Sequence, residues 1–390
     1  MISVSDALEK LLTLVAPMPV EDVPLRAAAG RVLAREVKAG RTQPPFAASS
    51  MDGYALRRAE VEPDAMFKVV GESAAGHRFD GPVKAGQAVR IFTGAPIPED
   101  ADFVVIQEDV TRRGDLITLG HSPGIKDNIR PAGGDFSAGD SLPAPQRLRP
   151  ADIALLAAMN IAQVPVSRKP QVAVLATGDE LVQPGDTPGP DQIVASNSYG
   201  LAAMFEQIGA EVRLLPIARD SAASLRQAFA LARGADLIIT IGGASVGDHD
   251  LVAPVAADLG LDQAFYKVAM RPGKPLMAGR MGRAAMIGLP GNPVSAMVCG
   301  VVFVAPVLRK MLGLNDVAVA LQDAPLAVDL PANGPRAHYM RARLRDGAVH
   351  PDTKQDSSLL SVLAQADALL VRPVDDPARR AGETVQILIL

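Results

Sequence analysis

The second half of the chain alternates strand-like and helix-like segments, and this alternation restricts the fold more than any other feature of the sequence. It begins after Lys169, where short apolar runs predict strands and longer amphipathic stretches predict the helices between them. The expected strands are 172–176, 212–215 and 237–240, and the expected helices lie near 198–208, 221–233 and 251–259. This pattern is typical of a multidomain chain built around a doubly wound α/β sheet.

The α/β domain is expected to end with three more strands and a long helix. The strands are predicted at 265–268, 276–278 and 284–287, and an apolar helix follows from Pro293, where proline is tolerated in the first turn. This domain is expected to end near Leu314.

The start of the chain predicts a small helical module. Residues 5–15 place apolar side chains on one helical face with Ser5 as the expected N-cap, and residues 26–38 are predicted to form a second amphipathic helix. Prolines mark a break before Ala151, and a helix at 151–158 is expected to pack back on this module.

Two regions have the short apolar runs of β domains. Runs at 67–70, 88–92, 103–107 and 116–119 predict a small inserted β domain, and runs at 326–330, 338–344, 369–371 and 385–390 predict a C-terminal β barrel. We therefore expect four domains: residues 1–42 with 137–168, residues 43–136, residues 169–316 and residues 317–390.

Composition excludes several classes of partner. The formal net charge of −4 opposes nucleic-acid binding, and the absence of tryptophan removes the best stacking residue for single strands. A lone cysteine, Cys299, permits no disulfide and predicts a reducing compartment, so a cytoplasmic location is expected. Neither a signal peptide nor a membrane span is expected. Of the classes of function considered, chemistry on a small molecule is the one that remains.

Carboxylates follow three successive predicted strands of the α/β domain. Glu180 follows the first strand, Asp220 the second and Asp250 the third. Ligands of an open parallel sheet bind beyond the carboxyl ends of its strands, so these side chains are expected at one rim. They predict an oxygen-ligand site for Mg²⁺ or another hard cation, shared with a substrate phosphate. The alternative is that they are helix N-caps, above all Asp220, which precedes Ser221.

Glycines and cations near the same rim predict an anion site. Gly242, Gly243 and Ser245 offer backbone N–H groups in a tight turn, although glycine pairs are also common in ordinary turns. The cations Lys267, Arg271 and Lys274 surround a Pro-Gly turn that holds them at low entropic cost.

Three other residues are expected to have no part in the chemistry. His249 is interpreted as an exposed loop histidine rather than a metal ligand. Cys299 is interpreted as an inert buried thiol, and Met270 as a packing residue.

Six ordered motifs together resemble the MoeA and gephyrin E-domain family of molybdopterin molybdenumtransferases. They span most of the chain, and their joint occurrence is far more specific than any single motif. The motifs are Ser50-Met51-Asp52-Gly53-Tyr54-Ala55, Phe92-Thr93-Gly94-Ala95-Pro96-Ile97-Pro98, Thr177-Gly178-Asp179-Glu180-Leu181, Gly242-Gly243-Ala244-Ser245-Val246-Gly247-Asp248, Arg271-Pro272-Gly273-Lys274-Pro275 and Gly288-Leu289-Pro290-Gly291-Asn292-Pro293.

The resemblance implies a reaction and an assembly. The reaction is insertion of molybdate into adenylylated molybdopterin with release of AMP, dependent on Mg²⁺ or another divalent cation. The assembly is an elongated homodimer in which the α/β domain of one protomer faces the inserted β domain of the other, with transient contacts to molybdopterin-handling proteins.

The resemblance also implies roles for particular residues. Catalytic roles fall to Asp52, Thr93, Glu180, Asp220 and Asp250, of which the last three would also hold the metal. Substrate binding falls to Asp135, Gly242, Gly243, Ser245, Lys267, Arg271, Lys274, Pro290, Pro293, Arg341 and Ser357. The chain departs from the family at two of its positions: Gly134 replaces the usual acid, and Arg271 stands where many relatives have lysine.

Two rival functions have different sequence requirements. Adenylylation of molybdopterin needs only the α/β module, so the flanking domains disfavour it. A receptor-binding scaffold, the additional role of gephyrin, is disfavoured because nothing here resembles gephyrin's extra N-terminal domain and linker.

Overall fold

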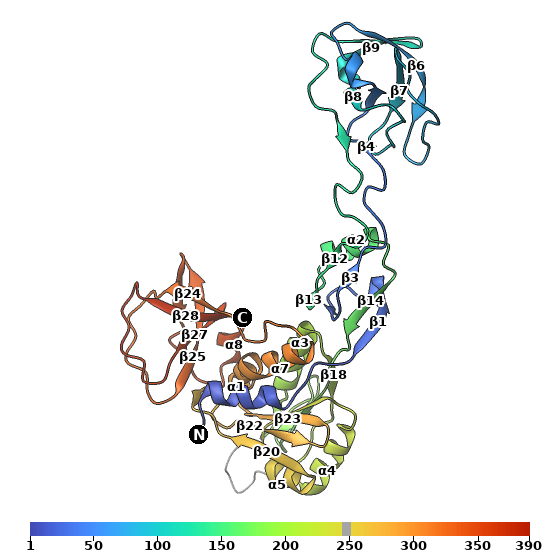
Figure 1. Ribbon diagram of the computed structural model, residues 1–390. Helices are drawn as coiled ribbons and strands as arrows, with labels where there is room; N and C mark the ends of the chain where they lie inside the picture. The colour runs from blue at the N-terminus through green and yellow to red at the C-terminus, as the bar shows by residue number, and fades with distance from the viewer. Residues whose placement is uncertain (244–250) are drawn as a thin grey trace.

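The computed structural model describes residues 1–243 and 251–390, and it shows an extended molecule. An α/β body carries a C-terminal β module at its side, and an arm projects from the body to a distal β module (Figure 1). Because the arm separates the distal module from the body, residues of the two do not meet within one chain.

A six-stranded mixed sheet forms the centre of the body. Its strands, in spatial order, are β18 (Glu211–Leu214), β15 (Gln171–Ala176), β19 (Leu237–Ile241), β23 (Ala284–Leu289), β22 (Met277–Met281) and β20 (Leu261–Tyr266). The first four are parallel; β22 pairs antiparallel with β23, and β20 pairs antiparallel with β22. The predicted strands are confirmed to within a few residues, except that β20 lies earlier than expected, because Lys267 has a left-handed φ of 68° that ends the strand.

Helices cover both faces of this sheet, so the prediction of a doubly wound fold is confirmed (Figure 1). One face packs against α1 (Val4–Thr13), α3 (Asn197–Ile208), α6 (Pro293–Cys299) and α7 (Ala305–Met311). The other face packs against α4 (Ala222–Leu231) and α5 (Val252–Asp258).

The helical run from α6 through a π-helical turn (Gly300–Val304) to α7 is apolar enough to cross a membrane by length and composition. Its most apolar window is 78% buried, which identifies it as a core helix of this fold. Cys299 lies in this run, fully buried, and burial raises the pKa of its thiol, so the expected inert role agrees with its surroundings.

The first helix begins two residues earlier than expected. Ser3 is its N-cap, because the Ser3 hydroxyl accepts a hydrogen bond from the Asp6 N–H at 3.0 Å and the Asp6 carboxylate accepts one from the Ser3 N–H at 3.4 Å. The prediction of Ser5 as the cap is therefore wrong. The helix also packs on the body rather than on the arm: Ala7 and Leu11 belong to the body's core.

The base of the arm is mainly β structure. Its sheet has the order β1 (Val20–Pro24), β14 (Gln163–Ser167), β2 (Val32–Leu33) and β13 (Gln146–Arg147), and α2 (Pro150–Ala158) packs beside it. Packing of α2 on the opening residues is confirmed, since Leu156 shares a core with Ala28 and Leu33.

The prediction of a helix over 26–38 is wrong. Only one 3-10 turn (Leu25–Ala27) forms, and then Gly30 adopts a φ of +73° that leaves the helical conformation. The next residues form β2 and the short strand β3 (Val37–Lys38), because Val32 and Leu33 are both buried and pair with other strands. The four domain boundaries drawn from the sequence stay predictions.

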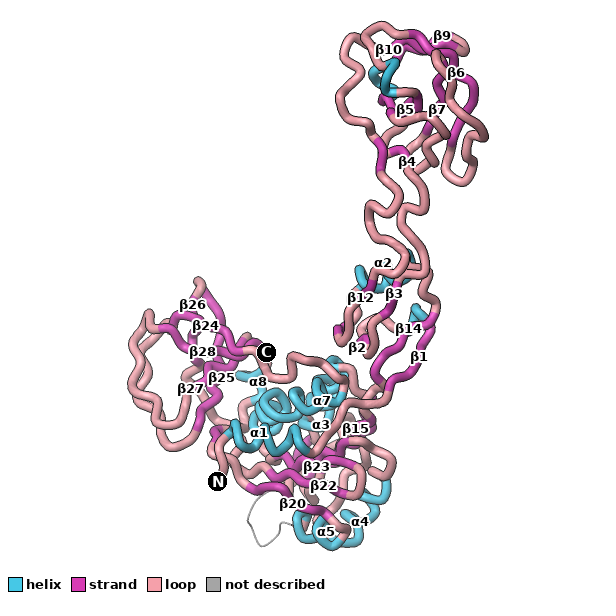
Figure 2. Tube along the Cα trace, viewed as in Figure 1, coloured by secondary structure: helices cyan, strands magenta, loops and turns pink. Residues whose placement is uncertain are grey.

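The distal module is a six-stranded sheet reached by two adjacent chain segments (Figure 2). Its strands, in spatial order, are β8 (Phe103–Ile106), β5 (Gly53–Leu56), β7 (Gln87–Ile91), β6 (Met66–Ser73), β10 (Leu116–Leu119) and β9 (Val110–Arg113). Short pairs join the segments on the way: β3 with β12 (Ser141–Leu142), and β4 (Ala48–Ser49) with β11 (Ile129–Arg130). All four predicted strands are confirmed; β5 and β9 were not predicted.

The C-terminal module is built on β25 (Ala337–Arg345). The sheet runs from β21 (Met270–Arg271) of the body through β25, β27 (Ala368–Arg372) and β28 (Thr384–Ile389) to β24 (Leu321–Pro325), and β26 (Ala348–Pro351) also pairs with β25. The strand predicted at 326–330 is wrong: β24 ends at Pro325, and Leu326 makes only an isolated bridge to Val349.

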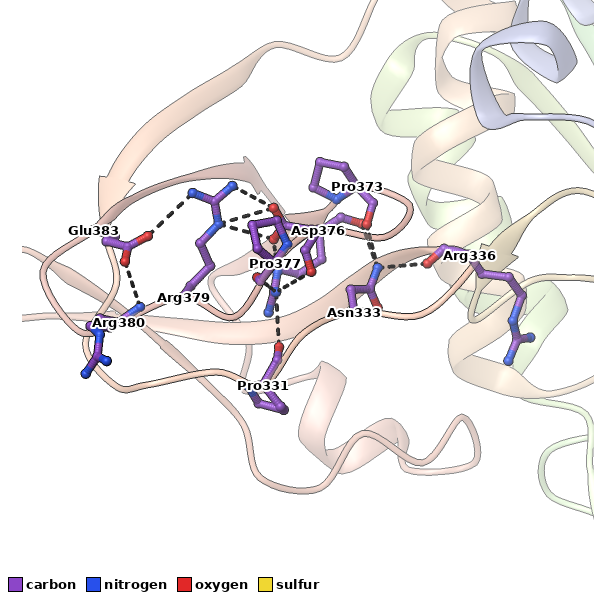
Figure 3. A network of polar contacts seen from close by, with 10 residues as sticks. Pro331, Asn333, Arg336, Pro373, Asp376, Pro377, Arg379, Arg380 and Glu383 are labelled. Atoms are coloured by element: carbon purple, nitrogen blue, oxygen red, sulfur yellow. Dashed lines mark hydrogen bonds and ion pairs between the residues drawn. The ribbon is translucent and has the colours of Figure 1, made fainter.

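A buried ionic network of this module joins Arg372, the last residue of β27, to the loop that follows it (Figure 3). The Asp376 carboxylate accepts hydrogen bonds from Arg372 and from Arg379, the latter at 2.6 Å. Arg372 is 3% exposed and donates further to the carbonyl oxygens of Pro331 and Pro377.

Asp376→Ala is expected to lower the free energy of unfolding by about 3 kcal/mol, because it leaves the buried Arg372 guanidinium without its counter-charge. Urea denaturation of the full chain measures the change. Asp323→Ala, which removes an exposed carboxylate from β24 of the same module, is the matched control and should have little effect. Equal stability of the two variants would contradict the prediction.

Candidate active site

A cavity of about 770 Å³ opens at the carboxyl ends of the parallel strands of the body. Loops that follow β15, β19 and β23 form it, as expected for an open α/β sheet. Its lining includes Thr177, Gly178, Glu180, Asp220, Gly242, Gly243, Pro290, Asn292, Pro293 and Ser358. The structure therefore brings together two of the three predicted rim carboxylates, both glycines and both prolines.

Glu180 projects into this cavity because a glycine precedes it. Gly178 has a φ of +149°, and a Cβ built on it would lie 2.3 Å from a Glu180 carboxylate oxygen. Any larger residue at position 178 would displace that carboxylate. No helix follows Glu180, since the next element is the short strand β16 (Leu181–Val182), so the N-cap alternative fails for this residue.

Asp220 is held at the rim by its neighbour across the loop. Its N–H donates to the Asp179 carboxylate at 3.2 Å, and the Arg219 guanidinium donates to the Asp179 carbonyl oxygen at 2.8 Å. The N-cap of α4 is Ser221, whose hydroxyl accepts a hydrogen bond from the Ser224 N–H. The Asp220 carboxylate is thus exposed and does not cap the helix.

The glycine pair keeps the centre of the cavity open. Gly242 has a φ of +89°, and a Cβ there would lie 2.8 Å from the Thr177 carbonyl oxygen. Its N–H donates to the Leu289 carbonyl oxygen at 3.1 Å, so that group is not free to bind an anion, contrary to expectation. Ser245 and Asp250 lie outside the described residues, as does His249.

The prolines and an asparagine form the cavity floor. Pro293 stands in the first turn of α6, and the Asn197 side chain donates to the Gly291 carbonyl oxygen at 2.7 Å. Asn292 donates from its side chain to the Ser357 hydroxyl at 3.1 Å. The C-terminal module therefore supplies part of the wall through Ser358, whereas its neighbour Ser357 contacts the floor residue Asn292 and is not among the lining residues.

The three predicted cations lie on the strand-and-turn segment beside the cavity rather than in its lining. Arg271 and Lys274 are exposed, while Pro275, directly after Lys274, does line the cavity. The Lys267 ammonium lies 4.8 Å from the centre of the Tyr266 ring. Of the three, only Lys274 directly adjoins a residue of the lining.

Arg341 does not have the position of a ligand-binding arginine. It is 1% exposed, and its guanidinium donates to the Asp356 carbonyl oxygen at 2.7 Å and to the Gln355 side-chain oxygen at 3.1 and 3.2 Å. Arg341 therefore supports the loop that ends at Ser357.

Asp52 and Thr93 form a pair on the distal module. The Asp52 carboxylate accepts hydrogen bonds from the Thr93 N–H at 2.7 Å and from the Thr93 hydroxyl at 2.8 Å. These two bonds, aided by the charge of Arg90, lower the pKa of Asp52. Asp135 is exposed on the connection between distal module and body. Within one chain, this pair is at the opposite end of the arm from the cavity (Figure 1).

A complete metal site is not assembled by the part of the chain that the structure describes. Among those residues, no three His, Cys, Asp or Glu side chains are grouped as ligands of one ion. Glu180 and Asp220 both line the cavity and have the oxygen ligands that a hard cation prefers. They could hold such an ion only together with other donors.

Four residues near the cavity were not predicted to act there: Asp179, Asn292, Gln355 and Ser358. Asp179 and Asn292 belong to motifs that were recognised, so the motif was the available signal. Nothing local in the sequence distinguishes Gln355 or Ser358, because their importance depends on contacts with distant elements.

Arginines surround a buried histidine where β21 meets β25. His338 is 8% exposed, and burial, followed by the charges of Arg271, Arg372, Arg341 and Arg336, lowers its pKa to about 4. The folded protein therefore keeps this imidazole neutral, whereas the unfolded chain protonates it below about pH 6.5.

This pKa difference predicts a specific loss of stability in acid. Stability contributed by neutral His338 is complete above pH 6.5 and declines as the pH falls toward 4. Urea unfolding at pH 7.5 and 4.5 measures the free energy of unfolding at both ends of this range. Between the two pH values, this free energy should fall by about 2 kcal/mol less in His338→Gln than in wild type. An identical pH dependence of the two proteins would refute it.

The fold and cavity define a class: multidomain α/β enzymes that bind small polar ligands at a strand-end rim. Comparisons with known proteins then identify the family. The MoeA N-terminal region (domain I and II) matches residues 2–160, the family described as "Probable molybdopterin binding domain" matches 173–310, and the MoeA C-terminal region (domain IV) matches 323–390.

Full-length relatives agree with these matches. The chain is 37% identical to a molybdopterin molybdenumtransferase of Nostoc sp., covering 95% of this chain and 88% of the relative. It is 35% identical to one of Haemophilus influenzae, covering 99% and 98%. The crystal structure of a molybdopterin biosynthesis MoeA protein from Pyrococcus horikoshii superposes with a TM-score of 0.85 at 29% identity, covering 100% of both chains. The chain belongs to the MoeA family of molybdopterin molybdenumtransferases.

Proposed function

We propose that this enzyme inserts molybdate into adenylylated molybdopterin and releases AMP, with the strand-end cavity as the reaction site. The observation that carries the proposal is the meeting of Glu180, Asp220 and the glycine pair in one cavity beside a cationic turn, within a chain of this family. A cavity of about 770 Å³ also suits a ligand of pterin-nucleotide size.

Charged and uncharged residues in and beside the cavity have different roles in this proposal. Arg271 and Lys274, exposed on the turn that leads to Pro275 of the lining, attract the two anionic substrates and hold oxyanions by charge-assisted hydrogen bonds. Gly242 and Gly243 line the cavity without a side chain, so a ligand can approach the backbone there. Pro290 and Pro293 fix the floor, so the site needs little reorganisation when substrates bind.

Dependence on a divalent cation, expected to be Mg²⁺, is part of the proposal. Glu180 and Asp220 would hold the cation, with Asp250 as a further donor. A bound cation supplies charge neutralisation at the phosphoanhydride when AMP departs. The carboxylates themselves bind through exposed oxygens that no helix cap occupies.

A homodimer would complete the site. The Asp52 and Thr93 pair is polar and ordered, but the arm holds it away from the cavity of its own chain. A second copy could place the pair over that cavity. The compartment proposed for this reaction is the cytoplasm, with molybdopterin-handling proteins as transient partners.

AMP release from adenylylated molybdopterin tests the function directly. Purified enzyme should release AMP only when molybdate and Mg²⁺ are both present, and the product should activate an apo-molybdoenzyme. Consumption of ATP with free molybdopterin would instead indicate the preceding adenylylation step. Absence of both reactions would reject the proposal.

A further inference from the structure

The C-terminal module reaches the cavity through one loop, residues 352–358, between β26 and the short helix α8 (Leu360–Leu363). The Ser357 carbonyl oxygen accepts a hydrogen bond from the Val294 N–H at 3.0 Å, and the Ser357 hydroxyl accepts one from Asn292 at 3.1 Å. Both donors lie at the start of α6, which forms the cavity floor. The position of this loop therefore sets the shape of one cavity wall.

One side chain organises the start of this loop. The Gln355 side-chain oxygen accepts hydrogen bonds from Arg341, from the backbone N–H at 3.0 Å and from the guanidinium at 3.1 and 3.2 Å. Its side-chain nitrogen donates to the carbonyl oxygens of Arg341 at 2.9 Å and Asp352 at 2.8 Å. Both ends of the amide are thus engaged with β25 or with the loop itself.

The amide completes the hydrogen bonding of β25 beyond the end of β26. β26 pairs with β25 only as far as Pro351 opposite Ala342; at the next residue of β25, the Asp352 N–H still donates to the Arg341 carbonyl oxygen at 2.9 Å, and the Arg341 N–H donates to Gln355. Gln355 bonds to both the N–H and the carbonyl oxygen of Arg341, as a neighbouring strand would. The loop can therefore leave the sheet without exposing unsatisfied backbone groups.

The same contact directs the rest of the loop. With Gln355 fixed, the Asp356 carbonyl oxygen accepts from the Arg341 guanidinium at 2.7 Å. The Asp356 carboxylate then accepts from the Ser358 N–H at 2.8 Å and from its hydroxyl at 2.7 Å. Ser358 is held in this way where it lines the cavity.

From these contacts we infer that Gln355 is a positioning residue for the reaction: it holds the loop so that Ser357 anchors it to the start of α6 and Ser358 completes the cavity wall. This inference rests on the proposed function. Gln355 acts through the serines and does not itself contact substrate. Glutamine suits the role because it both donates and accepts, whereas glutamate only accepts and methionine does neither effectively.

Gln355→Met, which keeps the volume and loses the hydrogen bonds, is the main variant. We expect its KM for molybdate to rise about tenfold while kcat stays within about threefold, the pattern of lost uniform binding. Gln355→Glu keeps the acceptor and should fall between wild type and Gln355→Met. Gln365→Met is the matched control, because Gln365 belongs to the same module but accepts from Arg343 outside this loop.

Trypsin cleavage after the exposed Lys354 reports on the loop itself. Cleavage should be about tenfold faster in Gln355→Met than in wild type, with cleavage after Arg112 of the distal module unchanged. Faster cleavage together with a raised KM supports the assignment. Unchanged cleavage, or faster cleavage with an unchanged KM, overturns it. If Gln355→Met does not fold, Gln355→Glu takes its place in the same two assays.

The assignment can be separated from the proposed function. If wild-type enzyme shows no molybdate-dependent turnover, the proposed function fails, and amide exchange at Val294 then decides the role of Gln355. That N–H donates to Ser357 and should be protected in wild type and exposed in Gln355→Met. Equal protection in the two proteins would reject the positioning role as well.

Discussion

Glu180→Gln is expected to lower molybdate-dependent AMP release by at least about 100-fold without destabilising the protein, the size of effect seen when one electrostatic contact to a reacting group is lost. The side chain is exposed and lines the cavity, so its charge contributes to the site rather than to the core. AMP release and the thermal unfolding midpoint should be measured on the same preparation.

The matched control is Glu206→Gln, which neutralises an exposed glutamate on α3 of the same body. It should retain wild-type turnover. Full activity of Glu180→Gln would remove this carboxylate from the mechanism, and a large fall in the unfolding midpoint would show that its role is structural.

Mixing two inactive variants should restore activity if the site is shared between protomers. Asp52→Ala and Glu180→Ala are each expected to be inactive as homodimers. In a mixed dimer, one site receives Asp52 from one protomer and Glu180 from the other, and is intact, whereas the second site lacks both. Random exchange makes about half of the dimers mixed, so about a quarter of wild-type activity should return.

The controls for this experiment are each variant mixed with itself, which should stay inactive. Dimer exchange must be verified with differently tagged chains. Failure to recover activity after verified exchange would show that Asp52 and Glu180 do not cooperate across protomers, and that the arm has another purpose.

The α/β body was the most predictable part of the molecule. Its parallel strands are buried on both faces, so they appear as continuous apolar runs such as Val172 to Ala176, and amphipathic helices separate them. In this part of the chain, the apolar residues that predict each strand or helix are also the residues that are buried in the fold. That agreement also brought Glu180 and Asp220 to one cavity as expected, since parallel strands end at one edge of the sheet.

The opening residues were less predictable because tertiary contacts override local pattern. The helical periodicity of residues 26–38 matches an amphipathic helix, but Val32 and Leu33 are both buried by strand pairing. The N-cap at Ser3 was missed because Asp6 at the third helical position decides between two nearby serines.

Within the site, the limits of sequence reasoning lie in contacts between distant segments. Arg341 was expected to bind substrate, yet its guanidinium is used by Gln355 and Asp356. A basic residue assigned from a family resemblance shows only that charge is needed near a position. Which partner that charge meets depends on the packing of β25 against the loop, and no local spacing encodes it.

The first helix has a consequence for how the protein is made. The ammonium of Lys310 donates to the Leu12 carbonyl oxygen at 2.7 Å, a contact between positions 298 residues apart. At ribosomal rates of roughly 5–20 residues per second, the interval between synthesis of α1 and synthesis of α7 is therefore about 15–60 s. A ten-residue helix is marginally stable alone, and the part of its apolar face that packs on α7 stays uncovered during that time. An N-terminal fusion partner or a nascent-chain chaperone would act on the protein during this interval.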